Sequence, residues 1–335
     1  MATADKEAVR RQRARAAATL GVLALFAAAF LLAAQLLMPA DDAAGSGPEA
    51  AIEGMVSDEA AAADPFYTLL IGSDSRRGTA LYTGKANEHA QVDQHSDVMM
   101  LVRVDPATYT ITLVSIPRDT QLQGDKGKIN DSLRNNNPEE AVAAAERLTG
   151  VGIDYYLMAT FLSFESLVND VGGVTVDVPL KVTVVDPSVG RDVTVKAGDD
   201  QKLNGSQALV FARARREYRS DQDAYRQANV RQIVESMITA ALGSTQLTER
   251  GVGALEENVK TNFDFDLLMQ VALQFQAHSD EVTFYSATGP YTGGENEDKL
   301  WVVPEDAEAW SELMAAVDAG EDPAAVIEPL VYKRD

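Results

Sequence analysis

The chain contains one long apolar segment, residues 19–38, which carries no charge and a single amide, Gln35. Twenty helical residues span about 30 Å, the thickness of the hydrocarbon core of a bilayer. Five basic residues precede this segment, and Lys and Arg gather at the cytoplasmic end of membrane helices. The sequence therefore predicts one transmembrane helix, a cytoplasmic N-terminus and a large domain outside the cytoplasm.

A cleaved signal peptide is the alternative interpretation of this segment. The apolar region of such peptides is usually about 7–15 residues long, and small residues mark the cleavage site. Met38-Pro39-Ala40-Asp41 lacks that pattern. We therefore expect residues 1–18 to be a cytoplasmic tail, 19–38 an uncleaved anchor and 39–64 a linker rich in Ala, Gly and acidic residues. No ATP pool exists outside the membrane, so a transferase there must use a substrate that was activated beforehand.

The charge of the chain is strongly acidic and uneven. The formal net charge is −22; five basic and two acidic residues give +3 within residues 1–38, so the remaining 24 basic and 49 acidic residues give −25. Such a domain repels nucleic acid, whose binding needs clustered Lys and Arg. The absence of cysteine excludes disulfides, thiolate zinc sites and a cysteine nucleophile. Three histidines are too few for a histidine-rich metal site.

Residues 65–318 alternate strand patterns with helix patterns. The turn Asp105-Pro106-Ala107-Thr108 joins two strands that are apolar on both faces, which predicts a central hairpin. The predicted fold class is α/β, with a mixed central β-sheet and helices on both faces, preceded by one transmembrane helix and followed by a tail at 319–335. The predicted strands are 67–71, 98–104, 109–116, 174–178, 181–185, 193–196 and 282–286, and the predicted helices are 138–148, 161–171, 208–211, 225–241, 264–277 and 304–317.

Charged side chains gather at four places where a strand ends or a helix begins: 72–77, 95–97, 115–130 and 211–226. Arginine suits bidentate recognition of phosphate, and aspartates hold Mg²⁺. Arg213 and Arg215 would point to one face on an extended segment. The combination predicts a pyrophosphate site with a divalent cation, although a solvated ion pair is the simpler explanation for any one of these residues.

Five segments carry a resemblance to a known family. They are LLIGSDSR (69–76), HSDVMMLVRVDPATYTITLVSIPRDT (95–120), GKIN (127–130), IDYYLMATFLSFESLVNDVGGVTVDVP (153–179) and LNGSQALVFARAR (203–215). Across residues 65–318 the chain resembles the LytR-CpsA-Psr family. The resemblance implies a phosphotransferase domain that moves a glycopolymer from undecaprenyl pyrophosphate to a peptidoglycan hydroxyl and releases undecaprenyl phosphate. It also implies an apolar tunnel for the lipid.

The resemblance further implies roles for single residues. It makes Arg118 and Asp223 catalytic, with Asp223 either orienting the arginines or accepting the proton of the attacking hydroxyl. It assigns Mg²⁺ or Mn²⁺ to Asp74 and Asp97. The implied pyrophosphate-binding residues are Arg76, Arg118, Lys128, Arg213, Arg215 and Arg226.

Several positions depart from the family pattern. His95 stands where the family commonly has arginine, and Val230 stands where a glutamine is expected. Thr160 and Ser163 replace an aspartate and a glycine. Each of these departures could change how the predicted site binds its ligand.

Two other functions fit the same residues. With water in place of the glycan hydroxyl, the site would act as a lipid-pyrophosphate pyrophosphatase. A non-enzymatic envelope regulator or scaffold is the third hypothesis, which the predicted topology opposes because DNA binding needs a cytoplasmic domain. Trp301 and Trp310 are expected to pack in the C-terminal helical region, with sugar stacking as the alternative.

The predicted partners follow from the main hypothesis. They are a polyprenyl-pyrophosphate glycopolymer as donor, peptidoglycan as acceptor and the membrane through the N-terminal helix, with no nucleic acid. The predicted location is the cell membrane, in which a single-pass protein carries an extracellular catalytic domain.

Overall fold

The computed structural model describes residues 64–330 except 76–78 and 81–94, and these described residues belong to one compact unit. The predicted tail 1–18, transmembrane helix 19–38 and nearly all of the linker 39–64 lie outside the described residues, as does Arg76. Among the helices that are described, none has the length and apolar character needed to cross a bilayer.

Six strands form the central sheet, in the order β10-β5-β1-β2-β3-β11. β2 is antiparallel to β1 and β3, whereas β5 runs parallel to β1 and β11 runs parallel to β3. The sheet is therefore mixed, as the sequence predicts, and the predicted hairpin forms its centre. The bounds are β1 Phe66–Ser73, β2 Ser96–Asp105, β3 Thr110–Ile116, β5 Tyr155–Ala159, β10 Lys260–Thr261 and β11 Thr283–Thr288.

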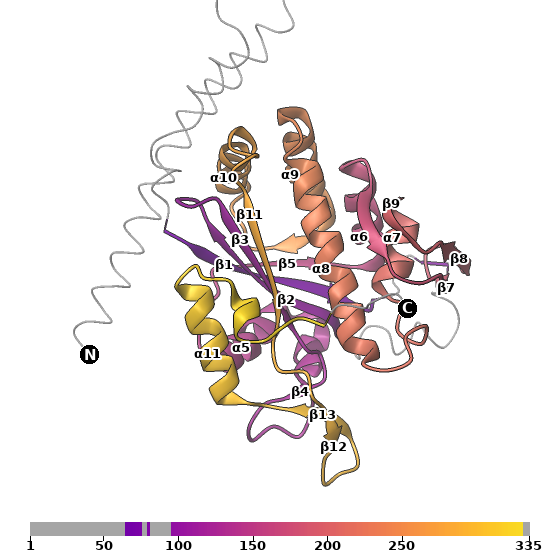
Figure 1. Cartoon of the computed structure of the whole chain (residues 1–335), viewed down its shortest axis with the longest axis vertical. Helices are drawn as coiled ribbons and strands as arrows, with labels where there is room; N and C mark the ends of the chain where they lie inside the picture. Colours follow the sequence, from indigo (N-terminus) through magenta and orange to yellow (C-terminus); the bar gives the residue numbers. More distant parts are fainter. Residues whose placement is uncertain (1–63, 76–78, 81–94, 331–335) are drawn as a thin grey trace, which may run out of the picture. The chain divides into compact units, whose positions relative to one another are not determined.

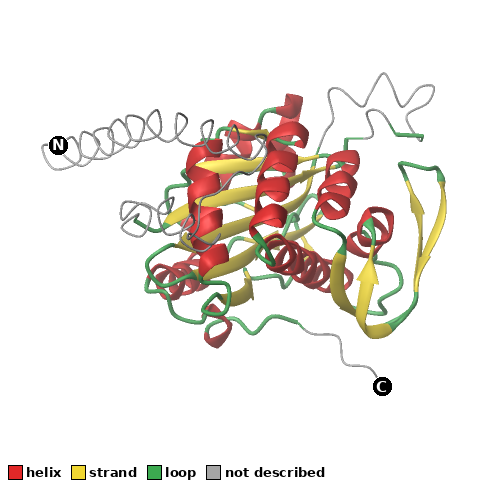
Figure 2. Cartoon of the chain, turned by 90° about the horizontal axis from the view of Figure 1, so that it is seen from above, coloured by secondary structure: helices red, strands yellow, loops and turns green. Residues whose placement is uncertain are grey.

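Helices cover both faces of the sheet (Figures 1 and 2). Alternate residues of β2 point to opposite faces: Met100 and Val102 join the core beneath α7, α8 and α10, while Met99 and Leu101 join the core beneath α5 and α11. The predicted α/β class with two helical layers is confirmed. The helices are η1 Ile129–Asn136, α5 Pro138–Thr149, α6 Phe161–Asp170, α7 Gly205–Ala212, α8 Gln222–Ala241, α9 Thr245–Asn258, α10 Phe265–Ala277, α11 Ala307–Asp318 and η2 Pro323–Ala325.

Smaller sheets extend the two layers. β4 (Thr120–Gln121), which follows β3, pairs in parallel with β13 (Trp301–Pro304), and β13 pairs with β12 (Gly294–Glu295). This three-stranded sheet projects from the lower end of the central sheet in Figure 1. The other small sheets are β6 (Val174–Val178) with β9 (Gly198–Leu203), and β7 (Val182–Asp186) with β8 (Arg191–Val195).

The two tryptophans differ in environment. Trp310 on α11 is 1% exposed, as expected for a residue packed in the C-terminal helical region. Trp301 on β13 is 56% exposed, so the expectation that it packs in that region was wrong. Its neighbours Val302 and Val303 are buried, and Trp301 occupies the outward position at the start of the strand.

Candidate active site

An apolar cavity of about 500 Å³ lies between the sheet and the helices α6, α8, α9 and α10. Its walls include Leu70 from β1, Val234 from α8 and Leu255 from α9. Five charged side chains also line it, and among them Asp97 and Arg215 are partly exposed to solvent. These five are Asp97, Arg118, Arg213, Arg215 and Arg226.

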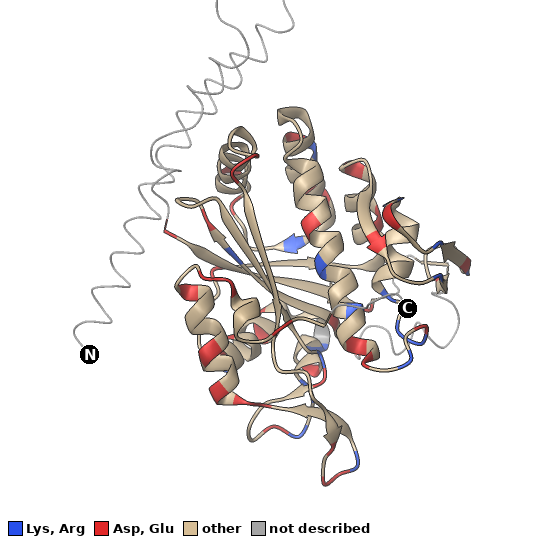
Figure 3. Cartoon of the chain, in the orientation of Figure 1, with Lys and Arg blue, Asp and Glu red and all other residues tan. Residues whose placement is uncertain are grey.

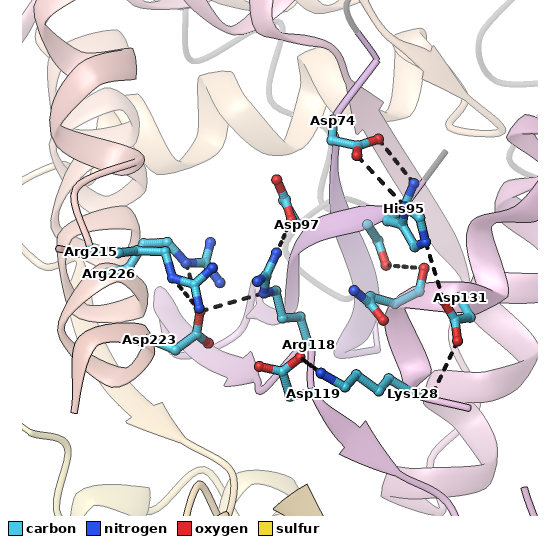
Figure 4. Close-up of polar contacts among 12 residues, drawn as sticks. Asp74, His95, Asp97, Arg118, Asp119, Lys128, Asp131, Arg215, Asp223 and Arg226 are labelled. Carbon is cyan, nitrogen blue, oxygen red and sulfur yellow. Dashed lines mark hydrogen bonds and ion pairs between the residues drawn. The ribbon is translucent and has the colours of Figure 1, made fainter. Parts of the chain in front are cut away.

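Asp223 holds three arginines together beside the cavity (Figure 4). Its Oδ1 lies 3.0 Å from Nε of Arg226 and 3.6 Å from Nε of both Arg118 and Arg215. Arg118 also forms an ion pair with Asp97 through its Nη1. The turn after β3, the segment after α7 and the first turn of α8 thus converge on one carboxylate. Figure 3 shows basic segments beside the lower end of α8, within a chain that is otherwise mostly acidic.

Local structure explains how the segments reach this point. Pro117 ends β3, and its carbonyl accepts a hydrogen bond from the backbone N–H of Thr120 at 3.0 Å, so Arg118 lies in a tight turn. Asp223 lies in the first turn of α8, which begins after Asp221 in a left-handed conformation with φ of 46°. A carboxylate in that turn also interacts favourably with the helix dipole.

The charged groups of the cluster shift one another's pKa. Burial acts to raise the pKa of Asp223, but the charge and hydrogen bond of Arg226 and the hydrogen bond of Gln227 outweigh it and hold the pKa well below its usual range. Burial and the nearby Arg118 lower the pKa of Arg215. Three guanidinium groups, those of Arg118, Arg215 and Arg226, face the two carboxylates of Asp97 and Asp223, which leaves a net charge of +1. This excess favours an anionic ligand.

Two guanidinium donors of this cluster are buried against Asp223. Nε of Arg118 and Nε of Arg215 are inaccessible to solvent and make no hydrogen bond, because both lie 3.6 Å from Asp223. A buried donor without a hydrogen bond is costly, about 1–3 kcal/mol, and the charge of Asp223 at 3.6 Å offsets part of that cost. The positive charge of the cluster suits the oxygens of a phosphate group.

Gln227 is a site residue that sequence reasoning missed. Its amide donates to Oδ2 of Asp223 at 2.8 Å and accepts from the hydroxyl of Thr288 at 3.2 Å. Its spacing of four residues from Asp223, one helical turn, was the available signal. Val230, where a glutamine was expected, instead lines the apolar cavity. The amide that contacts Asp223 thus comes from one turn earlier.

Arg213 and Lys128 lie outside the cluster around Asp223. Arg213 ends α7 in a helical conformation, so the extended segment assumed for it and Arg215 was wrong. Its Nη1 donates to the carbonyl of Val185 at 2.7 Å, and its guanidinium lies over the ring of Phe161 at 5.0 Å. Lys128 pairs with Asp119 at 2.7 Å. Arg213 still lines the cavity, so it can contact a ligand there.

His95 lies between two carboxylates. Its Nδ1 is 3.7 Å from Asp74, its Nε2 is 3.3 Å from Asp131, and its backbone N–H donates to Asp74 at 3.0 Å. Asp74 follows β1 and Asp97 is the second residue of β2, so the strand pairing brings both carboxylates to the same end of the sheet (Figure 4). Within the described residues, no group of three or more His, Asp or Glu side chains is arranged to hold a metal ion.

The other departures from the family pattern have a structural role. The side chain of Thr160 caps α6 by accepting from the backbone N–H of Ser163 at 3.3 Å, and the two hydroxyls lie 3.1 Å apart. Threonine is a good N-cap residue. The replacement of aspartate by Thr160 therefore keeps the start of the helix that carries Phe161.

The chain is similar in sequence to a known family and to transferases within it. The profile of the LytR_cpsA_psr family matches residues 40–316. The chain is 30% identical over 236 residues to the polyisoprenyl-teichoic acid–peptidoglycan teichoic acid transferase TagU of Bacillus licheniformis, covering 68% of this chain and 70% of that protein. TagV of Bacillus subtilis, a transferase of the same description, is 29% identical over 215 residues, covering 60% of this chain and 54% of that protein.

Solved structures share the fold. The crystal structure of Bacillus subtilis TagV superposes with a TM-score of 0.58 at 26% identity, covering 81% of this chain and 98% of that one. The structure of TagT bound to LI-WTA superposes with a TM-score of 0.54 at 20% identity, covering 78% and 92%, and shows likeness of fold alone. Sequence profile, relatives and fold agree, and the chain belongs to the LytR-CpsA-Psr family.

Proposed function

We propose that this protein transfers a glycopolymer from a polyprenyl pyrophosphate to a hydroxyl of peptidoglycan. The observation that carries the proposal is the arginine cluster at the polar end of an apolar cavity, where Arg118, Arg215 and Arg226 meet. A lipid pyrophosphate has the same two parts, an apolar chain and a polyanionic head. The relatives named as transferases of teichoic acid to peptidoglycan support the same chemistry.

In this reaction the acceptor oxygen bonds to the phosphorus next to the glycan, and the bond from that phosphorus to the oxygen of polyprenyl phosphate breaks. The proton of the acceptor hydroxyl passes to the departing polyprenyl phosphate. Phosphoryl transfer requires mainly positioning and neutralisation of charge. Arg118 and Arg215 bind the phosphate oxygens, while their buried Nε groups face Asp223. Asp223 orients the arginines, since a carboxylate with so low a pKa and three arginine partners is a poor proton acceptor.

A divalent cation, Mg²⁺ or Mn²⁺, is the proposed cofactor. Asp74 and Asp97 would supply its carboxylate oxygens, and Mg²⁺ typically takes only one or two carboxylates beside phosphate and water. The cation would neutralise charge on the pyrophosphate. Arg118, Arg215 and Arg226 bind and orient the donor through their own charges, independently of the cation.

Removal of divalent cations is expected to lower transfer by at least tenfold, because pyrophosphate charge would then face Asp74 and Asp97 unscreened. The measurement is polymer attachment by the full chain after chelation and after readdition of Mg²⁺ or Mn²⁺. Asp97→Asn should reduce the stimulation by Mg²⁺, whereas Asp125→Asn, at a surface pair with Arg147, should leave it unchanged. Full activity in the chelated protein would exclude the metal.

The apolar cavity supplies the sharpest test of the proposal. Ala272 lines it, while Ala277 on the same helix is exposed and does not. Ala272→Trp should fill the cavity and reduce use of a long-chain polyprenyl donor by about tenfold or more, with less effect on a short-chain donor. Ala277→Trp is the matched control and should behave as the parent chain. Equal use of both donors by Ala272→Trp would show that the lipid does not occupy the cavity.

The proposed location is the cell membrane, with residues 19–38 as a single anchor and the catalytic domain outside the cell. The apolar segment and the basic residues before it support this orientation. Protease added to intact cells should digest residues 65–318. Protection of that domain until the cells are lysed would place it in the cytoplasm.

A further inference from the structure

The β12–β13 hairpin presents an aromatic surface to solvent. Trp301 is 56% exposed and Leu300 beside it is 38% exposed. A Cβ built on Gly293 would lie 2.9 Å from Nε1 of Trp301, so the indole lies against the backbone of a glycine. One side of the ring is thereby supported by the hairpin, while more than half of the residue remains open to a ligand.

Hydrogen bonds fix the β12–β13 hairpin internally and to the segment Asp119–Gln121. The side-chain oxygen of Asn296 accepts from the backbone N–H groups of Asp298 and Leu300, both at 3.0 Å. The amide nitrogen of Asn296 donates to the side chain of Gln121 at 3.3 Å. Val303 pairs with Thr120 and donates its backbone N–H to the carbonyl of Asp119 at 2.9 Å. Trp301 therefore has a fixed place relative to the turn that carries Arg118.

The hairpin and the apolar cavity lie on different sides of Arg118. The cavity lies on the face of the sheet covered by α6, α8, α9 and α10. The strand β4 leaves Arg118 toward the other layer, where Leu122 packs with α5 and α11. Figure 1 shows β4, β13 and β12 below the central sheet, away from α9 and α10.

The geometry of phosphoryl transfer indicates from which side of Arg118 the acceptor approaches. In phosphoryl transfer the attacking and leaving oxygens lie roughly in line through phosphorus. If the polyprenyl phosphate leaves into the cavity, as the proposed function requires, the attacking hydroxyl must approach from the opposite side. That is the side of Arg118 to which the β12–β13 hairpin is attached.

We propose that Trp301 is an acceptor subsite that stacks on a sugar ring of the peptidoglycan glycan strand; this rests on the proposed function. Pyranose rings with equatorial substituents present C–H groups on their faces, and the electron-rich face of indole attracts such groups. Glu295, which pairs with Trp301 across the hairpin and is exposed, can accept hydrogen bonds from sugar hydroxyl or amide groups. An aromatic ring beside a carboxylate suits a neutral hexosamine.

Steady-state kinetics of the full chain test the subsite. Trp301→Ala should raise KM for the peptidoglycan acceptor by about tenfold, since a lost aromatic contact has roughly that effect. KM for the lipid-pyrophosphate donor and kcat at saturating acceptor should change less than about twofold. Trp301→Phe should recover most of the acceptor KM. Val189→Ala removes a similarly exposed apolar side chain, 47% exposed, elsewhere in the molecule and should leave all constants unchanged.

Fluorescence provides a readout that does not depend on transfer. The chain has two tryptophans, and Trp310 is buried, so soluble glycan fragments of peptidoglycan should shift the emission of Trp301. Trp301→Phe should abolish the shift. No shift in the parent chain, or an unchanged acceptor KM in Trp301→Ala, would overturn the subsite while transfer itself persists. A parent chain that binds the fragments but transfers no polymer would instead refute the proposed function.

Discussion

Arg118→Ala is expected to lower glycopolymer transfer by about 10³-fold or more, the effect of removing an arginine that stabilises charge during phosphoryl transfer. Arg118 connects the two carboxylates of the site, since Nη1 pairs with Asp97 and Nε faces Asp223. No other described side chain pairs with both. The measurement is attachment of labelled polymer to peptidoglycan by the full chain at saturating donor.

The fold should survive this substitution. Asp97 is 35% exposed and can be solvated, and Asp223 keeps Arg215 and Arg226 as partners. Arg118→Lys tests whether charge alone suffices, and we expect it to remain at least tenfold below the parent, because an ammonium group cannot reproduce the planar fork. Arg147→Ala removes an exposed surface arginine and is the matched control. Normal transfer by a folded Arg118→Ala protein would remove the main argument for the site.

Much of the fold could be predicted from sequence because its local signals agree with the tertiary structure. Asn137 and Pro138 start α5, and Gly150 ends it with φ of 74°, as their residue types predict. The central hairpin followed from two apolar runs around a proline turn. Among the elements that were missed, β5 is only five residues long, and α9 contains Gly251 and Gly253, which weaken a helical pattern.

The site was predictable in its residue types but not in its geometry. Spacing could not show that Asp223 gathers Arg118 and Arg215 from outside its own helix, because those contacts depend on where α7 ends and α8 begins. Arg213 diverges from Arg215 for the same reason: the chain is helical up to Ala212. The apolar cavity was also invisible to periodicity, since its lining comes from elements whose apolar residues would otherwise simply form core.

Asp223→Asn is expected to destabilise the fold, although the residue lies at the active site. The substitution leaves Arg226, whose side chain is 6% exposed, without its ion-pair partner, and removal of one member of a buried pair costs about 3–5 kcal/mol. We expect the lower end, about 3 kcal/mol, because Arg215 is 37% exposed and solvent screens its pair. The Tm should fall by roughly 6–12 °C in a thermal unfolding experiment.

The effect should depend on pH with a definite sign. Because folding lowers the pKa of Asp223 below the value of 3.8 for the unfolded chain, its contribution is complete above that pH. The Tm difference between parent and Asp223→Asn should therefore be constant from about pH 5 to 8. It should shrink as the pH falls below 3.8 toward the folded pKa. A difference that grows on acidification would contradict the assigned ion pairs.

Binding of inorganic pyrophosphate distinguishes the loss of ion pairs in Asp223→Asn from a general loss of packing. In Asp223→Asn the arginines lack a competing carboxylate, so pyrophosphate should bind more tightly and raise the Tm more than it does in the parent. Asp125→Asn, which disrupts only the surface pair with Arg147, should respond to pyrophosphate as the parent does. Transfer should still be lost in Asp223→Asn, because arginines that bind the anion without orientation no longer match the transition state. If pyrophosphate stabilised the parent more than the variant, Asp223 would belong to the ligand site itself instead of holding the arginines for it.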